Sequence, residues 1–169
     1  MNTMGSPIKL ALAALALGTG SAAMAQGGSE AEAGLEFSHF YQAISVENIE
    51  TVSAFYVDNL GFEVELDTSL GGAIQFRWLT NGSSRIELIQ MTGSQAGPER
   101  GPPPGHLGIR GFSHLGIETP DIVATKAALV ARGVTIAVDI TELAPLGIKA
   151  MFVLDPEGNA IEIIEVMSD

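Results

Sequence analysis

Two eight-residue stretches of the sequence are near-copies of each other, and this repeat constrains the fold more than any other feature. Residues 84–91 read SRIELIQM and residues 159–166 read NAIEIIEV, with Glu87 and Glu162 at matching places in otherwise apolar segments. Each stretch follows the same succession of patterns: a short strand, an amphipathic helix and two further strands. The order β-α-β-β-β, met twice in one chain, predicts an α+β fold built from two fused modules.

The first module, residues 37–91, opens with a predicted strand at 39–46. The helix after it begins at the N-cap residue Asn48 and ends at Gly61. Strands are predicted at 62–67, 73–80 and 84–91, and Asn81-Gly82 between the last two is a signal for a two-residue hairpin. Such a hairpin pairs Thr80 with Ser83, which places Trp78 opposite Arg85 and Phe76 opposite Glu87.

The second module, residues 111–168, repeats this order. Its opening strand is predicted at 111–118, and its helix starts with Thr119 as N-cap and Pro120 at the first position, running to about Arg132. Strands follow at 134–138, 148–154 and 160–166. We expect the modules to pair about a pseudo-twofold axis, so that their sheets form one cup-shaped, mostly antiparallel surface with the helices outside.

The segment between the modules, residues 92–110, is long and rich in proline and glycine. Its composition predicts either a plain linker or a loop that covers a functional site. These two interpretations remain open from the sequence.

The N-terminus predicts export. An apolar run at 10–17 and the residues Ala23-Met24-Ala25 before Gln26 are typical of a signal peptide, here residues 1–25. Residues 26–36 predict a flexible lead, because they contain almost nothing that can be buried. We therefore expect a periplasmic or secreted protein, without a membrane anchor once the signal peptide is removed. The chain contains no cysteine, so disulfides and thiolate chemistry are excluded.

The charge balance narrows the choice of partners. The chain carries 20 acidic and 8 basic residues, a net charge of −12. Such an excess of negative charge disfavours binding to nucleic acid and to anionic membranes. Small molecules and metal cations are the partners that we expect.

Side-chain alternation predicts which residues share a sheet face with the two glutamates. Glu87 shares its face with Phe76, Trp78 and Arg85, whereas Glu162 has no basic neighbour in its own strand. A half-buried carboxylate among apolar residues needs a partner. For Glu87 this is either a salt bridge to Arg85, itself stacked on Trp78, or a metal ion. One histidine, His114, lies in the opening strand of the second module, and together with the two glutamates it offers the N and O ligands that a divalent transition metal takes.

Three segments resemble the vicinal oxygen chelate superfamily, which includes glyoxalase I, bleomycin- and fosfomycin-resistance proteins, methylmalonyl-CoA epimerase and extradiol dioxygenases. They are ISVENIETVSAFYVDNLGFEV, HLGIETPDIVATKAALVARGV and LDPEGNAIEIIEV. The resemblance implies a cup-shaped sheet around a divalent metal (Zn, Mn, Fe, Co or Ni), held here by Glu87, His114 and Glu162. The fourth ligand position falls on Tyr41, two residues after His39, which could serve only if its strand slipped by two residues.

On this resemblance we expect a metal-dependent lyase or isomerase of glyoxalase type. Glu87 would act as the general base, and Tyr41, Phe76, Trp78 and Arg85 would contact a small oxygenated substrate. Two alternatives stay open. One is a non-catalytic binding protein of bleomycin-resistance type, and the other is an extradiol-type dioxygenase, which requires His39 or His106 beside His114 and Glu162. Members of the superfamily commonly form homodimers, so we expect one here.

Overall fold

The computed structural model of the chain describes residues 38–82 and 84–168. The predicted signal peptide and the flexible lead lie outside the described residues, so they remain sequence predictions. Within the described ranges, no helix has the length and hydropathy needed to cross a membrane.

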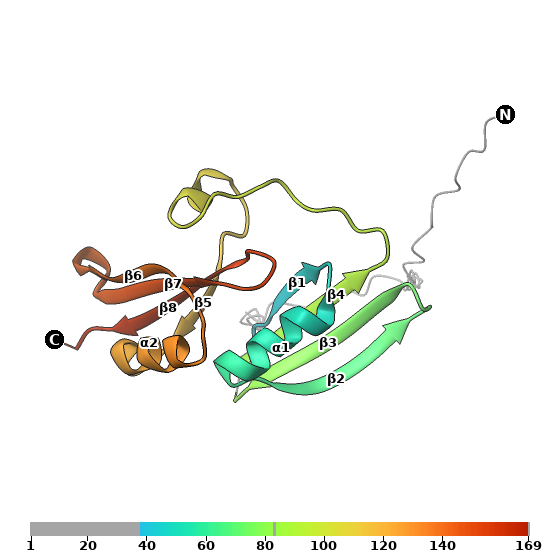
Figure 1. The fold of residues 1–169 in the computed structure, drawn as a ribbon, viewed down its shortest axis with the longest axis horizontal. Helices are drawn as coiled ribbons and strands as arrows, with labels where there is room; N and C mark the ends of the chain where they lie inside the picture. Colours follow the sequence, from blue (N-terminus) through green and yellow to red (C-terminus); the bar gives the residue numbers. More distant parts are fainter. Residues whose placement is uncertain (1–37, 83, 169) are drawn as a thin grey trace, which may run out of the picture. The chain divides into compact units, whose positions relative to one another are not determined.

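The first module forms one four-stranded sheet with one helix (Figure 1). Its elements are β1 (Gln42–Val46), α1 (Ile49–Leu60), β2 (Glu63–Leu70), β3 (Ile74–Asn81) and β4 (Ser84–Met91). The strand order is β1-β4-β3-β2, with β1 parallel to β4 and the other pairs antiparallel.

The second module repeats this plan with the order β5-β8-β7-β6. Its elements are β5 (Leu115–Glu118), α2 (Ile122–Ala131), β6 (Ile136–Leu143), β7 (Ile148–Leu154) and β8 (Ala160–Val166). Short 3-10 helices lie in the linker (η1, Gly105–Gly108) and between β6 and β7 (η2, Ala144–Leu146). The predicted fold class, α+β with two tandem βαβββ modules, is confirmed, and the strands form two four-stranded mixed sheets, one in each module.

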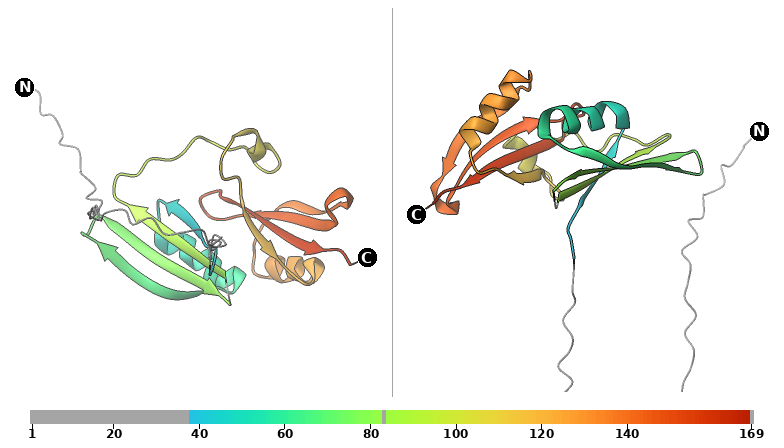
Figure 2. Two further views of the ribbon diagram at one scale, coloured as in Figure 1. Left: turned by 180° about the vertical axis from the view of Figure 1, so that it is seen from behind. Right: turned by 90° about the horizontal axis from the view of Figure 1, so that it is seen from below.

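Each helix covers one face of its own sheet (Figure 2). Apolar side chains that alternate along the strands point at the helix and are buried, because burial of this face drives the packing. The buried residues of both modules belong to one cluster: Val46, Ile49, Val52, Tyr56, Phe62, Leu79, Ile86, Leu88, Ile122, Leu129, Met151, Val153, Ile161 and Ile163. The two glutamates that mark the repeat point to the opposite sheet face, away from the helices.

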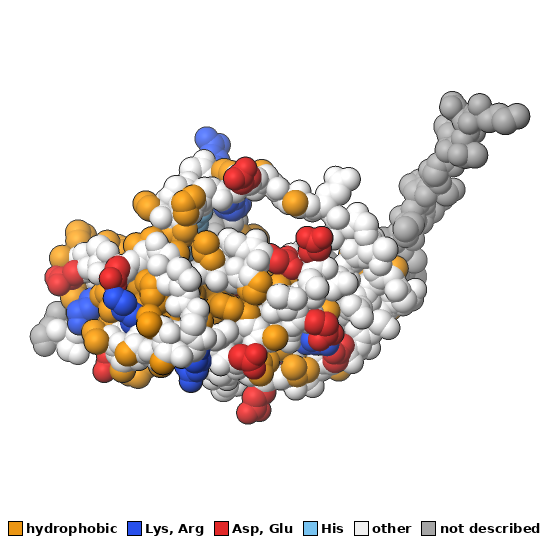
Figure 3. Space-filling view, in the orientation of Figure 1, with side chains coloured by type: hydrophobic (Ala, Val, Ile, Leu, Met, Phe, Trp, Pro, Cys, Tyr) orange, Lys and Arg blue, Asp and Glu red, His pale blue; other side chains and the backbone are white. Residues whose placement is uncertain are grey.

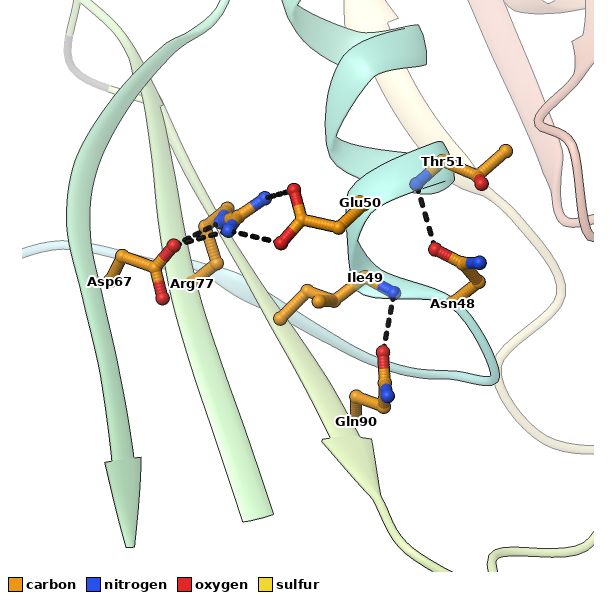
Figure 4. Close-up of polar contacts among 7 residues, drawn as sticks. All are labelled: Asn48, Ile49, Glu50, Thr51, Asp67, Arg77 and Gln90. Carbon is orange, nitrogen blue, oxygen red and sulfur yellow. Dashed lines mark hydrogen bonds and ion pairs between the residues drawn. The ribbon is translucent and has the colours of Figure 1, made fainter. Parts of the chain in front are cut away.

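The start of α1 shows why the helix begins where the sequence predicts. The side chain of Asn48 accepts a hydrogen bond from the Thr51 amide at 3.0 Å, and Gln90 at the end of β4 accepts one from the Ile49 amide at 2.7 Å (Figure 4). On the solvent side of this turn, Arg77 forms ion pairs with Glu50 and Asp67. The predicted N-cap Asn48 is therefore confirmed.

The start of α2 differs from the prediction. Its N-cap is Asp121, which accepts a hydrogen bond from the Ala124 amide at 2.9 Å, and Glu165 accepts one from the Ile122 amide at 2.8 Å. The predicted N-cap Thr119 instead bonds through its amide to the Ile164 carbonyl of β8, so it still belongs to the sheet. Gln90 and Glu165 thus perform the same task in the two modules.

The predicted hairpin register between β3 and β4 is wrong by two residues. Thr80 pairs with Arg85 and Trp78 pairs with Glu87. The physical reason is that Asn81 extends β3, pairing with Ser84 while its side chain donates to the Leu60 carbonyl at the end of α1. A shift of two keeps every side chain on its predicted face, since the side-chain period of a strand is two.

Candidate functional site

The structure brings together two of the three residues predicted to bind metal. His114, directly before β5, and Glu162 in β8 lie on the open face of the second sheet, with His114 Nε2 3.2 Å from Glu162 Oε2. Both side chains are about one-fifth exposed, at 23% and 21%. His114 is therefore the partner that Glu162 lacks within its own strand.

A third side chain, His106, reaches the pair from the linker. Its Nε2 lies 3.1 Å from His114 Nδ1, and its ring packs edge-on against Phe152 and His114. His106 is only 2% exposed. The linker therefore does more than connect the modules, because it buries a histidine against the open face of the second sheet.

The two ring nitrogens of His114 face different groups. Its Nε2 lies 3.2 Å from Glu162 Oε2. Its Nδ1 hydrogen-bonds with His106 Nε2 and with the Ser113 hydroxyl, each at 3.1 Å. The remaining nitrogen, His106 Nδ1, is buried and has no hydrogen-bond partner among the described residues. Glu162, His114 and His106 thus form a chain of contacts with His114 in the middle.

Replacing His106 with glutamine should flatten the dependence of stability on pH. Burial, followed by the neighbouring His114 and Arg100, lowers the pKa of His106 from 6.5. Because the unfolded chain then takes up a proton at higher pH than the folded chain, acidification below about pH 6.5 lowers the free energy of unfolding, by at most about 1.4 kcal/mol per pH unit. Denaturant unfolding at pH 7.5, 6.5 and 5.5 measures this loss.

The matched control for this experiment is His39→Gln, because His39 is an exposed histidine. It should keep the wild-type loss of stability on acidification. An unchanged pH dependence in the His106→Gln protein would show that His106 is not buried in its neutral form.

The described residues do not assemble a three-ligand metal site. They contain no cluster of three His, Cys, Asp or Glu side chains able to hold one ion. The chain of contacts explains this for His106, since His114 presents one ring nitrogen to Glu162 and the other to His106. The described residues therefore bring together two donors for a single ion, His114 Nε2 and Glu162, of the three that the sequence predicts.

The other predicted ligand, Glu87, has a different partner. Its carboxylate accepts a hydrogen bond from Trp78 Nε1 at 2.6 Å. Arg85 lies over the Trp78 ring at 4.4 Å, which is the predicted stacking, but its ion pair is with Glu65 at 2.8 Å and not with Glu87. The indole thus supplies the partner that a half-buried carboxylate needs.

The strand registers show which residue corresponds to His114 in the first module. Ala43 of β1 lies opposite Glu87, and Gly116 of β5 lies opposite Glu162. Counting back two residues in each strand makes Tyr41 the counterpart of His114. His39, two residues earlier still, is exposed and remains a prediction without support from the register.

A cavity of about 470 Å³ opens beside the histidines. We call it the linker pocket, because the linker arches over a hollow here (Figure 3). Its walls come from β1, the linker, the segment before β5 and the turn before β8. The lining residues are Gln42, Ala43, Ile44, Ser45, Tyr56, Arg100, Gly101, Pro102, Pro103, His106, Phe112, Ser113, His114, Leu115, Leu154, Gly158, Asn159 and Ala160.

The residues predicted to contact substrate lie elsewhere. Tyr41 and Arg85 line a second cavity of about 760 Å³, whereas Phe76 and Trp78 line neither cavity. His106 was predicted only as a ligand of the dioxygenase alternative, and Arg100 was not predicted as a site residue. The signal available for both was their position in a long Pro- and Gly-rich segment, which the sequence left open as a linker or a cover.

Comparison with known proteins agrees with this architecture. Residues 36–163 match the Glyoxalase/Bleomycin resistance protein/Dioxygenase superfamily. No functionally curated protein matches the chain. Among solved structures, SMU.1112c is 28% identical with a TM-score of 0.64, covering 78% of this chain and 100% of its own. A glyoxalase family protein from Enterococcus faecalis is 27% identical with a TM-score of 0.60, and the match covers 77% of this chain and 97% of that protein. TnmS3, an antibiotic binding protein from Streptomyces sp. CB03234, is 23% identical with a TM-score of 0.57, and the match covers 79% of this chain and 99% of that protein.

Proposed function

The chain belongs to the glyoxalase/bleomycin resistance/dioxygenase superfamily, and we propose that it is an exported small-molecule-binding protein whose ligand occupies the linker pocket. The observation that carries this proposal is the pocket itself, a cavity of about 470 Å³ lined by the His106–His114 pair and, for the larger part, by apolar residues. This volume lies in the range of roughly 300–1,000 Å³ that is usual for small-molecule sites.

The lining side chains would have two different roles in binding the ligand. Apolar groups such as Pro102, Phe112 and Leu115 would shield the ligand from water, while the Ser113 hydroxyl would orient it by a hydrogen bond and the His114 ring would pack against it. Glu162 lies 3.2 Å from the His114 ring and fixes its position, so this wall of the pocket is already in place before a ligand arrives. We prefer binding to catalysis because the predicted general base, Glu87, is not among the residues that line the pocket.

A thermal-stability screen against a library of small organic molecules tests the binding function. A ligand of the linker pocket should raise the unfolding temperature by an amount that grows with the logarithm of its concentration over its Kd. Calorimetric titration of each hit then gives affinity and stoichiometry. A chemically diverse library without a single saturable hit would contradict the proposed function.

The second candidate is the metal-dependent lyase or isomerase that the sequence predicts. One observation favours it: His114 Nε2 and Glu162 are a nitrogen and an oxygen donor 3.2 Å apart on a sheet face. For the dioxygenase alternative, the two histidines His106 and His114 and the carboxylate of Glu162 lie next to one another. However, His114 lies between the other two, so the three do not face one common point. Metal analysis of the purified protein beside Glu162→Ala separates these candidates from pure binding, because only a true metal site loses about one ion per chain in the variant.

Export is proposed from the N-terminal sequence. Expression of the full chain in a bacterial host should deliver it outside the cytoplasm, with an intact mass that begins at Gln26. A protein that stays in the cytoplasm at full length would contradict this part of the proposal. The homodimer expected from the superfamily is tested on the same material by light scattering.

A further inference from the structure

Provided that the linker pocket is the ligand site, as proposed above, we infer that it selects small carboxylic acids with an apolar body, and that Arg100 binds their carboxylate. Arg100 belongs to the linker and lines the pocket together with both histidines. The inference rests on the charge of the lining, on the uncommitted guanidinium and on the apolar remainder of the walls.

The charge of the pocket is opposite to that of the protein. The chain as a whole carries 20 acidic residues against 8 basic ones. None of the described residues that line the linker pocket is an aspartate or a glutamate, while Arg100, His106 and His114 are among them. A cavity with this lining concentrates anions locally, although the surrounding surface repels them.

The guanidinium of Arg100 keeps N–H groups that are available to bind a ligand. Its Nη1 donates to the Ile109 carbonyl at 3.2 Å, which anchors the side chain within the linker. Within the described part of the chain, no carboxylate lies within 4 Å of it, in contrast to Arg77 and Arg85, which are both paired with acids. A half-buried guanidinium with free N–H groups is suited to bind a carboxylate through two parallel hydrogen bonds.

The fixed positive charge of the pocket comes from Arg100, because a guanidinium is always protonated in a protein. One fixed positive charge suits one carboxylate. The remaining lining is largely apolar, with Pro102, Pro103 and Phe112 near Arg100 in the walls, so the rest of the ligand should be apolar, such as an aromatic or alicyclic ring.

The experiment compares acids with their neutral counterparts. The probes are benzoate, phenylacetate, mandelate and cyclohexanecarboxylate, each beside its primary amide, titrated calorimetrically into the full-length expressed protein at pH 7.5. Acids should bind at least tenfold more tightly than the matching amides. Arg100→Gln should remove this preference, and Arg100→Lys should retain part of it because the charge remains.

Arg110→Gln is the matched control, since Arg110 is an exposed arginine of the same linker. It makes the same change in net charge and should leave acid binding within twofold of wild type. Thermal unfolding of all variants shows whether they remain folded.

Three results would overturn the inference, and each leaves the proposed function separately testable. Equal affinity for acids and amides, or acid binding unchanged in Arg100→Gln, would remove the role of Arg100 while keeping the pocket as a binding site. If no acid binds, the carboxylate selectivity is wrong, and the library screen with neutral molecules decides whether the pocket binds anything.

Discussion

Replacing His114 with alanine should abolish specific binding in the linker pocket, with a loss of affinity of at least a hundredfold for any ligand found in the screen. His114 lines the pocket and joins Glu162 to His106 through its two ring nitrogens. Its removal leaves the half-buried Glu162 carboxylate and His106 Nε2 without this partner, and it takes away a ring that lines the pocket. Buried polar groups left unpaired cost about 1–3 kcal/mol each, so the folded pocket should also be distorted.

Calorimetric titration of wild type, His114→Ala and His114→Gln measures the effect. The glutamine variant retains a side chain able to hydrogen-bond and should recover part of the affinity. His39→Ala is the control for loss of an exposed histidine and should bind like wild type. Full affinity in His114→Ala, with unfolding still cooperative, would place the ligand outside the linker pocket.

Truncating a core residue in either module should destabilise the whole described domain. Leu88 in β4 and Ile163 in β8 are 0% and 1% exposed and belong to one apolar cluster that includes residues of both modules. Leu88→Ala and Ile163→Ala should each lower the free energy of unfolding by about 2–5 kcal/mol, because transfer energy is lost and a cavity is left. Both variants should unfold in one transition, at a lower denaturant concentration than wild type.

Chemical denaturation followed by circular dichroism checks this expectation. Val123→Ala is the control, since it removes the same kind of apolar atoms from a side chain that is 62% exposed, and it should cost less than about 0.5 kcal/mol. Two separate transitions, with only one shifted by each mutation, would show that the modules unfold independently and that the shared cluster does not couple them.

The sequence was sufficient for the fold because periodicity and capping are local properties. The internal repeat predicted two βαβββ modules, and Asn48 was identified as an N-cap from its neighbours alone. The start of α2 and the hairpin register were wrong where a longer-range contact decided the outcome. Thr119 is held in the sheet by the Ile164 carbonyl, and Asn81 is held at the end of α1 by the Leu60 carbonyl.

The candidate site was predictable only where the repeat marked it. Glu162 and His114 lie together, as their places in matching strands suggested. The partner of Glu87 was missed because the two-residue register error put Phe76, and not Trp78, opposite it. The positions of His106 and Arg100 could not be predicted for a different reason. A Pro- and Gly-rich linker has no periodicity, so its packing on a sheet face depends on tertiary contacts.

The most direct test of the central claim measures ligand binding before and after metal removal. Protein expressed as the full chain and purified without a metal-affinity tag would be titrated with a confirmed ligand, then dialysed against a chelator, titrated again, and assayed for metals by mass spectrometry at both stages. A binding protein of the kind proposed should keep its affinity within about twofold and contain well under one equivalent of metal throughout. Loss of binding on chelation, with about one Zn, Mn, Fe, Co or Ni per chain before treatment and recovery on reloading, would contradict the account and establish a metal site on His114 and Glu162.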